Sequence, residues 1–378
     1  MHFVAIGDIG VVDGMLHVGD EAMFEALVLE LRARGVDRIT AISSNVDDTR
    51  ARYGVDAIGG FGFTAHREHN ERLLAEGVSG AIREAVEQAD AVVVAGGGNM
   101  TSIWPSHVYA RAALGRLAAS SSVPFVVSGQ TIGPQLNERD GELVSEMLQS
   151  AALFGVRERD SLALCSSLGT TPFLNADDAS FLADITTTRE PLPPIPYALV
   201  SLSTHTAEHD KAAFVGVMAE LLDEVARHTA VVFTAHFAPL DGPPRGDELM
   251  HERVRSAMTQ PSGVTRVRDS ATSAALARNA ELVISSRYHP VVFAVSGGVP
   301  SIGIPVDDYT TTKLTGALGN FGQTSLLPID RLGEGADLFF DVWQARSLIR
   351  ERGLAEAAAQ RAASSDWWDR VARSGAPR

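Results

Sequence analysis

Arginine and histidine alternate in the segment Arg287-Tyr288-His289-Pro290, which directly follows the apolar run ELVISS. A guanidinium binds carboxylate or phosphate through parallel hydrogen bonds, and an imidazole can move a proton near neutral pH. Pro290 is suited to the first turn of a helix, so the segment is expected to join a strand to a helix. We predict that His289 is a catalytic residue and that Arg287 and Tyr288 bind an anionic substrate.

A second arginine, Arg157, stands at the end of the apolar run LFGV. At a strand end its guanidinium would be a permanently charged, planar donor directed toward a ligand. An ion pair with Glu158 or Asp160 is the alternative for the arginines of this segment. We predict that Arg157, rather than Arg159, binds substrate.

Three successive glycines and an asparagine, Gly96-Gly97-Gly98-Asn99, follow the apolar run DAVVVA. Glycines let the backbone approach a ligand or a neighbouring segment closely. The chain has no GxxxxGK[ST] sequence, so this is not a nucleotide P-loop. Close packing alone is the alternative, but the position after a predicted strand favours Gly97, Gly98 and Asn99 as substrate-binding residues.

Asp20 closes a glycine-containing loop from Gly7 to Gly19 and precedes an amphipathic helix. The glycine spacing is not GxGxxG, so a dinucleotide site is disfavoured. Asp20 could be either the N-cap of this helix or a catalytic residue. We include it among the predicted catalytic residues.

Two further polar groups have competing interpretations. The sequence His205-Thr-Ala-Glu208-His209 fits the H-x-x-E-H pattern of inverted zinc proteases, which requires both histidines on one helix face. We expect His205 in a loop, which favours a chance match or substrate contact over zinc, and we predict no metal site. Asp177 and Asp178 could accept sugar hydroxyls or cap a helix, and the cap is favoured.

The overall composition restricts the class of protein. With 378 residues and 45% apolar content, the chain is long enough for two domains. A net charge of -15 disfavours a nucleic-acid partner. The single cysteine, Cys165, cannot form an internal disulfide. The sequence has neither a membrane-length apolar run nor a signal-peptide pattern, so we expect a cytoplasmic protein without a membrane span.

Apolar runs alternate with amphipathic segments along most of the chain, as in parallel sheets covered by helices on both faces. In the N-terminal half we predict strands at residues 2–7, 38–43, 90–95, 123–128, 153–157 and 172–174, with helices at about 67–88, 106–120, 137–151 and 160–167. Beyond a proline-rich linker at 189–196, we predict strands near 197–203, 230–237, 264–268, 281–286, 301–304 and 324–328, with helices at about 207–227, 247–258, 271–280, 290–296 and 311–319.

These elements predict an α/β protein with two Rossmann-like, doubly wound domains that face each other across a cleft. The domains are predicted at residues 1–188 and 197–332, followed by a helical segment at 333–378 in which Trp367 and Trp368 pack on the body. Ligands of open parallel sheets bind beyond the carboxyl ends of the strands. The polar segments above would therefore line the cleft.

Six segments, taken in order, are similar to the polysaccharide pyruvyl transferase family: GDEA, DAVVVAGGGN, SGQTIGP, VRERDSLALC, ADDASFLAD and SSRYHPVVFAVSGGVPSIGIP. The resemblance implies a GT-B-like fold, phosphoenolpyruvate as donor substrate without a cofactor, and a cell-surface glycan or its precursor as acceptor. Arg157, Arg287 and His289 match the family's V-R-[DE] and R-x-H segments, and Asp20 matches its GD motif. The chain departs from the family at His17, where an asparagine is common.

The resemblance further implies that a pyruvyl group is transferred to two hydroxyls of one sugar, forming a cyclic ketal. The acceptor is left open as a polymer, a lipid-linked unit or a small glycoside, as is the oligomeric state. Two other functions compete with this one. A GT-B glycosyltransferase using a nucleotide sugar would have the same fold. A catalytically inactive glycan-binding protein would not need Arg157, Arg287 and His289.

Overall fold

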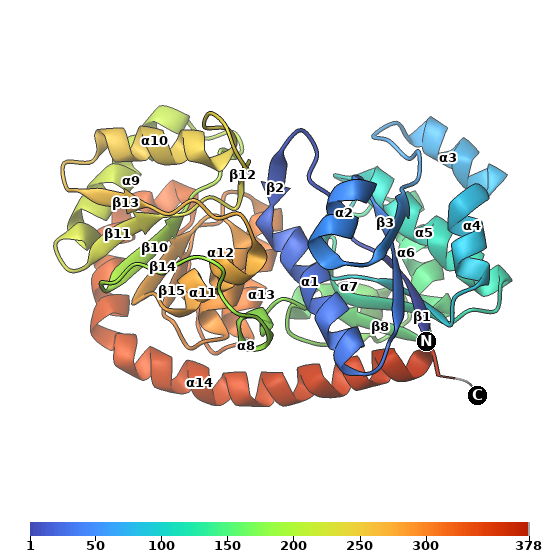
Figure 1. Cartoon of the computed structure of the whole chain (residues 1–378). Helices are drawn as coiled ribbons and strands as arrows, with labels where there is room; N and C mark the ends of the chain where they lie inside the picture. Colours follow the sequence, from blue (N-terminus) through green and yellow to red (C-terminus); the bar gives the residue numbers. More distant parts are fainter. Residues whose placement is uncertain (377–378) are drawn as a thin grey trace. The chain divides into compact units, whose positions relative to one another are not determined.

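The computed structural model describes residues 1–376, which form two compact α/β units (Figure 1). The first unit contains residues 1–12, 23–178 and the described residues from Ala362 onward. The second unit contains residues 13–22 and 179–361. The loop before Asp20 and the first turn of the following helix therefore group with the second unit, although they lie near the N-terminus.

The first unit is built on a parallel sheet with the strand order β4-β3-β1-β5-β7-β8-β9, and β6 pairs with β7. The strands are β1 (His2–Ile6), β3 (Arg38–Ser43), β4 (Asp56–Gly59), β5 (Ala91–Val94), β6 (Gly97–Met100), β7 (Phe125–Ile132), β8 (Leu153–Val156) and β9 (Phe173–Leu174). The helices are α1 (Val18–Ala33), which begins in the second unit, α2 (Val46–Tyr53), α3 (Arg67–Glu76), α4 (Gly80–Glu87), α5 (Pro105–Ser120), α6 (Glu138–Ser150) and α7 (Arg159–Ser167).

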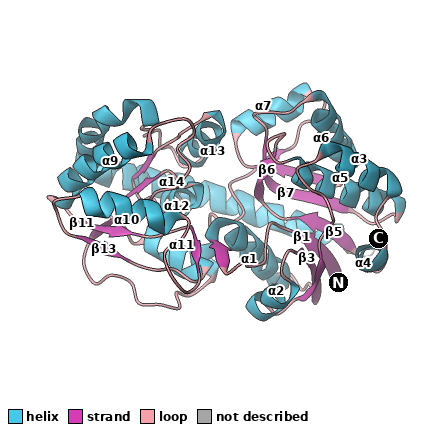
Figure 2. Cartoon of the chain, turned by 90° about the horizontal axis from the view of Figure 1, so that it is seen from above, coloured by secondary structure: helices cyan, strands magenta, loops and turns pink. Residues whose placement is uncertain are grey.

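Both faces of this sheet are covered by helices (Figure 2). Successive residues of β1 enter different cores, because side chains alternate along a strand. Val4 and Ile6 pack in the core under α4, α5 and α6, while Phe3 and Ala5 pack in the core under α1. This burial on both faces explains the continuous apolar runs and confirms the doubly wound arrangement expected from the sequence.

The second unit has a smaller parallel sheet with the order β13-β11-β10-β14-β15, and a separate antiparallel pair formed by β2 and β12. The strands are β2 (Met15–His17), β10 (Tyr197–Ser201), β11 (Ala230–Phe233), β12 (Phe237–Pro239), β13 (Ser262–Val264), β14 (Leu282–Ser285) and β15 (Ser301–Gly303). The helices are α8 (Leu182–Ile185), α9 (Lys211–Ala226), α10 (Asp247–Ala257), α11 (Ser270–Arg278), α12 (Tyr288–Val295) and α13 (Asp308–Gly319), followed by the 3-10 helix η1 (Ile329–Glu334).

Helix α14 (Gly335–Ser374) has 40 residues and contributes to both units. In its last part Trp367 and Trp368 are buried, and the Trp367 indole donates a hydrogen bond of 2.8 Å to the Ser128 hydroxyl. The prediction that the C-terminal helix packs its tryptophans on the body is thus confirmed.

Several elements differ from those expected. The strand predicted near 264–268 occurs earlier, as β13 at Ser262–Val264. The helix predicted at 67–88 is divided into α3 and α4, because Gly77 ends α3 in a positive-φ conformation. The run at 324–328 forms only an isolated bridge between Leu326 and Gly303 rather than a strand. The stretch 230–237 ends as a parallel strand at Phe233, and β12 then begins at Phe237 in a different sheet.

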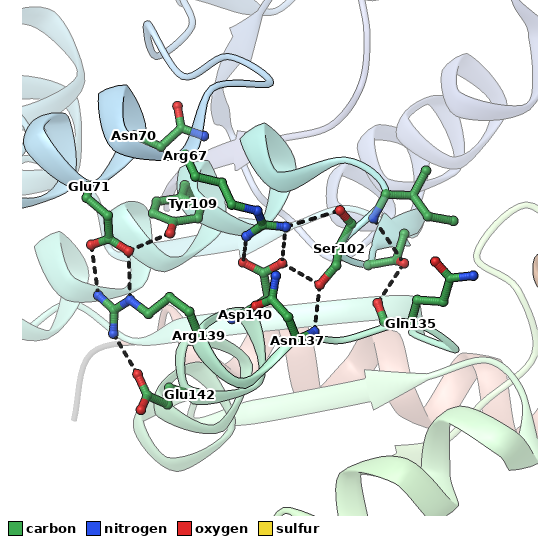
Figure 3. A network of polar contacts seen from close by, with 12 residues as sticks. Arg67, Asn70, Glu71, Ser102, Tyr109, Gln135, Asn137, Arg139, Asp140 and Glu142 are labelled. Carbon is green, nitrogen blue, oxygen red and sulfur yellow. Dashed lines mark hydrogen bonds and ion pairs between the residues drawn. The ribbon is translucent and has the colours of Figure 1, made fainter.

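A polar network joins α3, α5 and α6 (Figure 3). Arg67 donates to both carboxylate oxygens of the buried Asp140, at 2.6 and 2.8 Å. Arg139 contacts Glu71 in the same two-bond manner, at 2.8 and 3.1 Å, and Glu71 also accepts from the Tyr109 hydroxyl. Burial and the Glu71 carboxylate raise the pKa of Tyr109 to about 12. These groups satisfy one another, so the network orders α5 rather than offering a binding site.

Asp177 and Asp178 cap no helix, so the favoured interpretation of this pair was wrong. The N-cap of α8 is Phe181, and Asp177 instead pairs with a buried arginine. Asp178 accepts hydrogen bonds from the Gly96 amide at 2.9 Å and the Ser128 hydroxyl at 2.8 Å. Burial and the neighbouring Asp177 charge raise the pKa of Asp178 to about 7.

We expect an Asp178→Asn variant to change how stability depends on pH. An unfolded aspartate titrates near pH 4, so the stabilisation from protonated Asp178 is complete below that pH and is lost as pH rises toward about 7. An asparagine imitates the protonated carboxyl and lacks this loss. Denaturant unfolding should show wild type losing about 1 kcal/mol per pH unit relative to the variant across this window. A difference that is constant with pH would contradict the assignment.

Candidate functional site

Arg287 is the N-cap residue of α12 and forms a two-bond ion pair with Asp247 at the start of α10. Its Nε lies 2.9 Å from Oδ2 of Asp247, and its Nη2 lies 2.5 Å from Oδ1. The Asp247 side chain is fully buried, whereas the Arg287 side chain is 29% exposed. One edge of the guanidinium is therefore fixed by Asp247, and the partly exposed remainder can contact a ligand.

Asp247 is held by the loop before β12 as well as by Arg287. Its Oδ2 accepts hydrogen bonds from the backbone amides of His236 and Phe237, at 3.2 and 2.9 Å. The Phe237 ring lies 5.8 Å below the Arg287 guanidinium carbon, at cation–π distance. Asp247 thus sets the position of Arg287 through several fixed contacts.

His289 lies in the first turn of α12 and is only 9% exposed. Its ring packs between Tyr288, at 5.0 Å between centroids, and Phe293, at 5.9 Å. The backbone of Gly19 approaches the imidazole so closely that a β-carbon there would overlap the His289 ring. The glycine of the GDEA segment is therefore explained by close approach to His289 within the second unit.

We expect a Gly19→Ala variant to displace His289 because the added methyl group and the imidazole would overlap. Catalytic turnover should fall at least tenfold, and the free energy of unfolding should fall by about 1–3 kcal/mol. Initial rates and denaturant unfolding measure both effects. Gly14→Ala is a poor control because Gly14 has positive φ, so Gly216→Ala in α9, where a β-carbon meets open space, is the matched variant. Equal behaviour of the two variants would exclude the packing role of Gly19.

Asp20 lies inside the first turn of α1 and is not its N-cap, because the helix begins at Val18. Its Oδ2 lies 3.8 Å from Nδ1 of His17, and both side chains are partly exposed. His17 belongs to β2, which pairs with β12, and the Val18 amide donates to the His236 carbonyl at 3.0 Å. This pairing brings Asp20 into the same unit as Arg287 and His289, and its catalytic role stays a prediction.

Tyr288 is buried, with the Lys313 ammonium 5.0 Å from its ring centroid. His205 is exposed in the loop after β10, and its Nε2 lies 2.9 Å from Oδ2 of Asp307, the N-cap residue of α13. Both residues lie beyond the carboxyl ends of strands of the second unit. Their substrate contacts remain predictions.

The zinc-protease pattern does not have the geometry it requires. His205 and His209 precede α9, which begins at Lys211, so they do not share a helix face. Within residues 1–376, no group of three or more histidine, cysteine, aspartate or glutamate side chains is placed to hold a metal ion.

Arg157 lies directly after β8 in the first unit, with its side chain 1% exposed. Its Nη1 lies 2.6 Å from Oδ2 of Asp177, and its Nε donates to the Thr131 hydroxyl at 2.9 Å. Glu158, the ion-pair partner weighed from the sequence, is farther away at 3.7 Å. The arginine is thus ordered by an intramolecular ion pair, and its contact with substrate stays a prediction.

Gly97, Gly98 and Asn99 form most of β6, and the two glycines are buried. A β-carbon at Gly97 would lie 3.1 Å from the Gln130 amide, so close packing accounts for that glycine. The Asn99 amide donates to Asp8, which follows β1. The segment is therefore part of a polar cluster at the carboxyl ends of the strands of the first unit.

Asp247 and Asp8 were not identified from the sequence. Asp247 begins a predicted helix, which is typical of a residue that only caps, and Asp8 lies in a loop. Their partners Arg287 and Arg111 are 40 and 103 positions away along the chain. A carboxylate directly after the first strand was the one available signal for Asp8.

Solved structures place this fold among GT-B proteins. A putative UDP-N-acetylglucosamine 2-epimerase from Listeria monocytogenes matches with a TM-score of 0.64 and 13% identity, over 94% of this chain and 90% of that chain. UDP-GlcNAc 2-epimerase from Neisseria meningitidis gives 0.60 and 10%, over 94% of both chains. A calicheamicin glycosyltransferase gives 0.55 and 17%, over 99% of this chain and 98% of that chain. The two Rossmann-like units thus define a GT-B fold.

The sequence identifies the family within this fold. The model of the polysaccharide pyruvyl transferase family matches residues 17–308, which is more than three quarters of the chain. The chain therefore belongs to the polysaccharide pyruvyl transferase family and is a transferase, as the ordered segments indicated. No curated protein matches it. Within residues 1–376, none of the helices combines the length and apolar character needed to span a membrane.

Proposed function

We propose that this protein transfers the pyruvyl group of phosphoenolpyruvate to two hydroxyls of one sugar, forming a cyclic pyruvate ketal. The acceptor is a sugar of a cell-surface glycan or its precursor, including a lipid-linked unit. The observation that supports this most is the family match together with Arg287 and His289, which lie two residues apart at the start of α12. Phosphoenolpyruvate is a substrate in this proposal, and the reaction needs no added cofactor.

Arg287 is the donor-binding residue best supported by its geometry. Asp247 holds the Nε and Nη2 atoms of Arg287, so the orientation of the partly exposed guanidinium is fixed. Its Nη1 side is the part proposed to bind the donor. A positioned guanidinium loses less side-chain entropy when it binds an anion. Arg157 is retained as a proposed donor-binding residue of the first unit.

His289 is proposed to protonate the methylene carbon of phosphoenolpyruvate, which makes the central carbon electrophilic. One sugar hydroxyl then adds to that carbon. Phosphate leaves as the second hydroxyl forms its carbon–oxygen bond, closing the ketal. A general acid of this kind contributes roughly 10²- to 10⁴-fold to a rate. Asp20 is proposed to assist His289 from α1 of the same unit.

A thermal-shift comparison tests the choice of donor. A ligand that binds only the native state raises the melting temperature by mass action. We expect phosphoenolpyruvate to raise it, and UDP-sugars to leave it unchanged, although the solved epimerases and the glycosyltransferase share the fold. A shift with a nucleotide sugar and none with phosphoenolpyruvate would reject the proposal in favour of a glycosyltransferase. No shift with either donor would favour a glycan-binding protein.

A further inference from the structure

The first unit contains a second group of polar side chains that the proposed donor chemistry does not use. It consists of Asp8, two residues beyond β1, with Asn99 of β6 and His107 and Arg111 of α5. His107 and Arg111 are four residues apart, so they share one face of the helix. Strand ends and one helix face thus bring a carboxylate, an imidazole and a guanidinium together where ligands of parallel sheets bind.

Asp8 is held from three sides. Its Oδ1 lies 2.8 Å from Nδ1 of His107, and both carboxylate oxygens lie 3.2 Å from Nη2 of Arg111. The Asn99 amide also donates to it. Burial alone would raise the pKa of Asp8, but the Arg111 charge and the hydrogen bonds from His107 and Arg111 outweigh burial and hold this pKa well below its usual range. Asp8 is therefore a fixed carboxylate and not a proton carrier at neutral pH.

The contact with Asp8 determines how His107 carries its proton. A carboxylate only accepts hydrogen bonds, so Nδ1 of neutral His107 must be the donor, and the lone pair is left on Nε2. The His107 side chain is 32% exposed, and no residue among 1–376 makes a hydrogen bond to its Nε2. The Arg111 side chain, by contrast, is only 1% exposed and forms its ion pair with Asp8 in the protein interior. His107 is thus the member of the cluster that can reach a ligand.

We propose that His107 is a general base that removes the proton from an acceptor hydroxyl, and that Asp8 is the positioning residue that fixes its tautomer and orientation. The inference rests on the proposed function, because ketal formation must remove a proton from each of two hydroxyls. Like the proposed donor-binding residue Arg157, His107 and Asp8 belong to the first unit.

The step balances without a further reactant. Nε2 of His107 takes the hydroxyl proton, and the electron pair of that O–H bond forms the new bond to the central carbon of phosphoenolpyruvate. The π electrons of the donor take a proton at the methylene carbon. In the second addition the new carbon–oxygen bond replaces the bond to phosphate, which leaves with its electron pair. His107 returns each proton to solvent.

A purely structural cluster is the alternative, and chemical rescue separates the two. We expect His107→Ala to lower kcat about 10²- to 10⁴-fold, with the KM for phosphoenolpyruvate changed less than threefold. Added imidazole should restore at least a tenth of the lost rate, because it can occupy the space left by the side chain and supply the base. A structural role predicts no response to imidazole.

Two variants keep the test decisive. His107→Asn retains a donor near the Nδ1 position for Asp8, so it should fold normally and yet be as slow as His107→Ala. His69→Ala is the matched control, because His69 is a histidine of α3 in the same unit whose Nε2 lies 3.0 Å from the Gly62 carbonyl. Its turnover should equal that of wild type.

The outcomes distinguish this inference from the proposed function. If wild type forms the ketal and His107→Asn is also active, only the role of His107 is overturned. The same holds if imidazole does not rescue His107→Ala. Wild type that binds phosphoenolpyruvate and a glycoside but forms no ketal would reject the proposed function, and the inference with it. Slow variants with rescue of His107→Ala would support both.

Discussion

A His289→Ala variant is expected to form pyruvate ketal about 10²- to 10⁴-fold more slowly than wild type, with its fold intact. The imidazole lies in the first turn of α12, beside Arg287, and supplies the proton for the methylene carbon in the proposed reaction. Packing against Phe293 and Tyr288 is lost with the ring, so a stability loss of about 1 kcal/mol is also expected. Phosphate release and far-ultraviolet circular dichroism measure the two effects.

His209→Ala is the matched control for this variant. His209 is exposed in the turn before α9, and the structure gives it no part in the site. Wild-type turnover in His209→Ala would also exclude a catalytic role for the H-x-x-E-H pattern. Wild-type turnover in His289→Ala would remove His289 from the mechanism.

Breaking the pair of Arg287 and Asp247 should have the largest effect on stability. Asp247→Ala leaves Arg287 without its partner, and leaves the amides of His236 and Phe237 without an acceptor. Removing one partner of a buried pair costs about 3–5 kcal/mol, and the partial exposure of Arg287 places the expected loss near the lower limit. Phosphoenolpyruvate affinity should fall at least tenfold, because Arg287 loses its fixed orientation.

A double-mutant cycle measures this coupling. Arg287→Met leaves the Asp247 charge unpaired, so each single variant should lose more stability than a simple contact explains, and the double variant should lose less than the sum. Denaturant unfolding gives the stabilities, and calorimetric titration gives the affinity for phosphoenolpyruvate. Arg331→Met is the control, because the Arg331–Glu334 pair is exposed and screened by solvent, so its loss should leave stability nearly unchanged. Additive losses in the cycle would show that Asp247 does not position Arg287.

The sequence predicted the architecture well because burial on both faces of a parallel sheet leaves a strong pattern. The runs RITAIS and LFGV occur as β3 and β8, and the predicted C-terminal helix occurs as α14. The pairing of β2 with β12 joins residues more than two hundred positions apart, and three-residue strands leave no readable periodicity. The grouping of residues 13–22 with the second unit could not be predicted for that reason.

The candidate site was predictable where its residues are neighbours in sequence. Arg287, Tyr288 and His289 were identified from one strand-to-helix junction, and the structure places them at the start of α12. Contacts between distant segments were not predictable. Gly19 gave no sign that it packs on His289, and Asp247 was expected only to begin a helix. Local patterns specify elements and their ends, whereas ion pairs between elements depend on the assembled fold.

The most direct test of the proposed function is incubation of the purified protein with phosphoenolpyruvate and a panel of simple glycosides. We expect release of inorganic phosphate together with a glycoside mass gain that corresponds to a cyclic pyruvate ketal, and we expect both signals to disappear in His289→Ala. Transfer of a sugar from a nucleotide donor to the same glycosides, with phosphoenolpyruvate left unconsumed, would contradict the proposal.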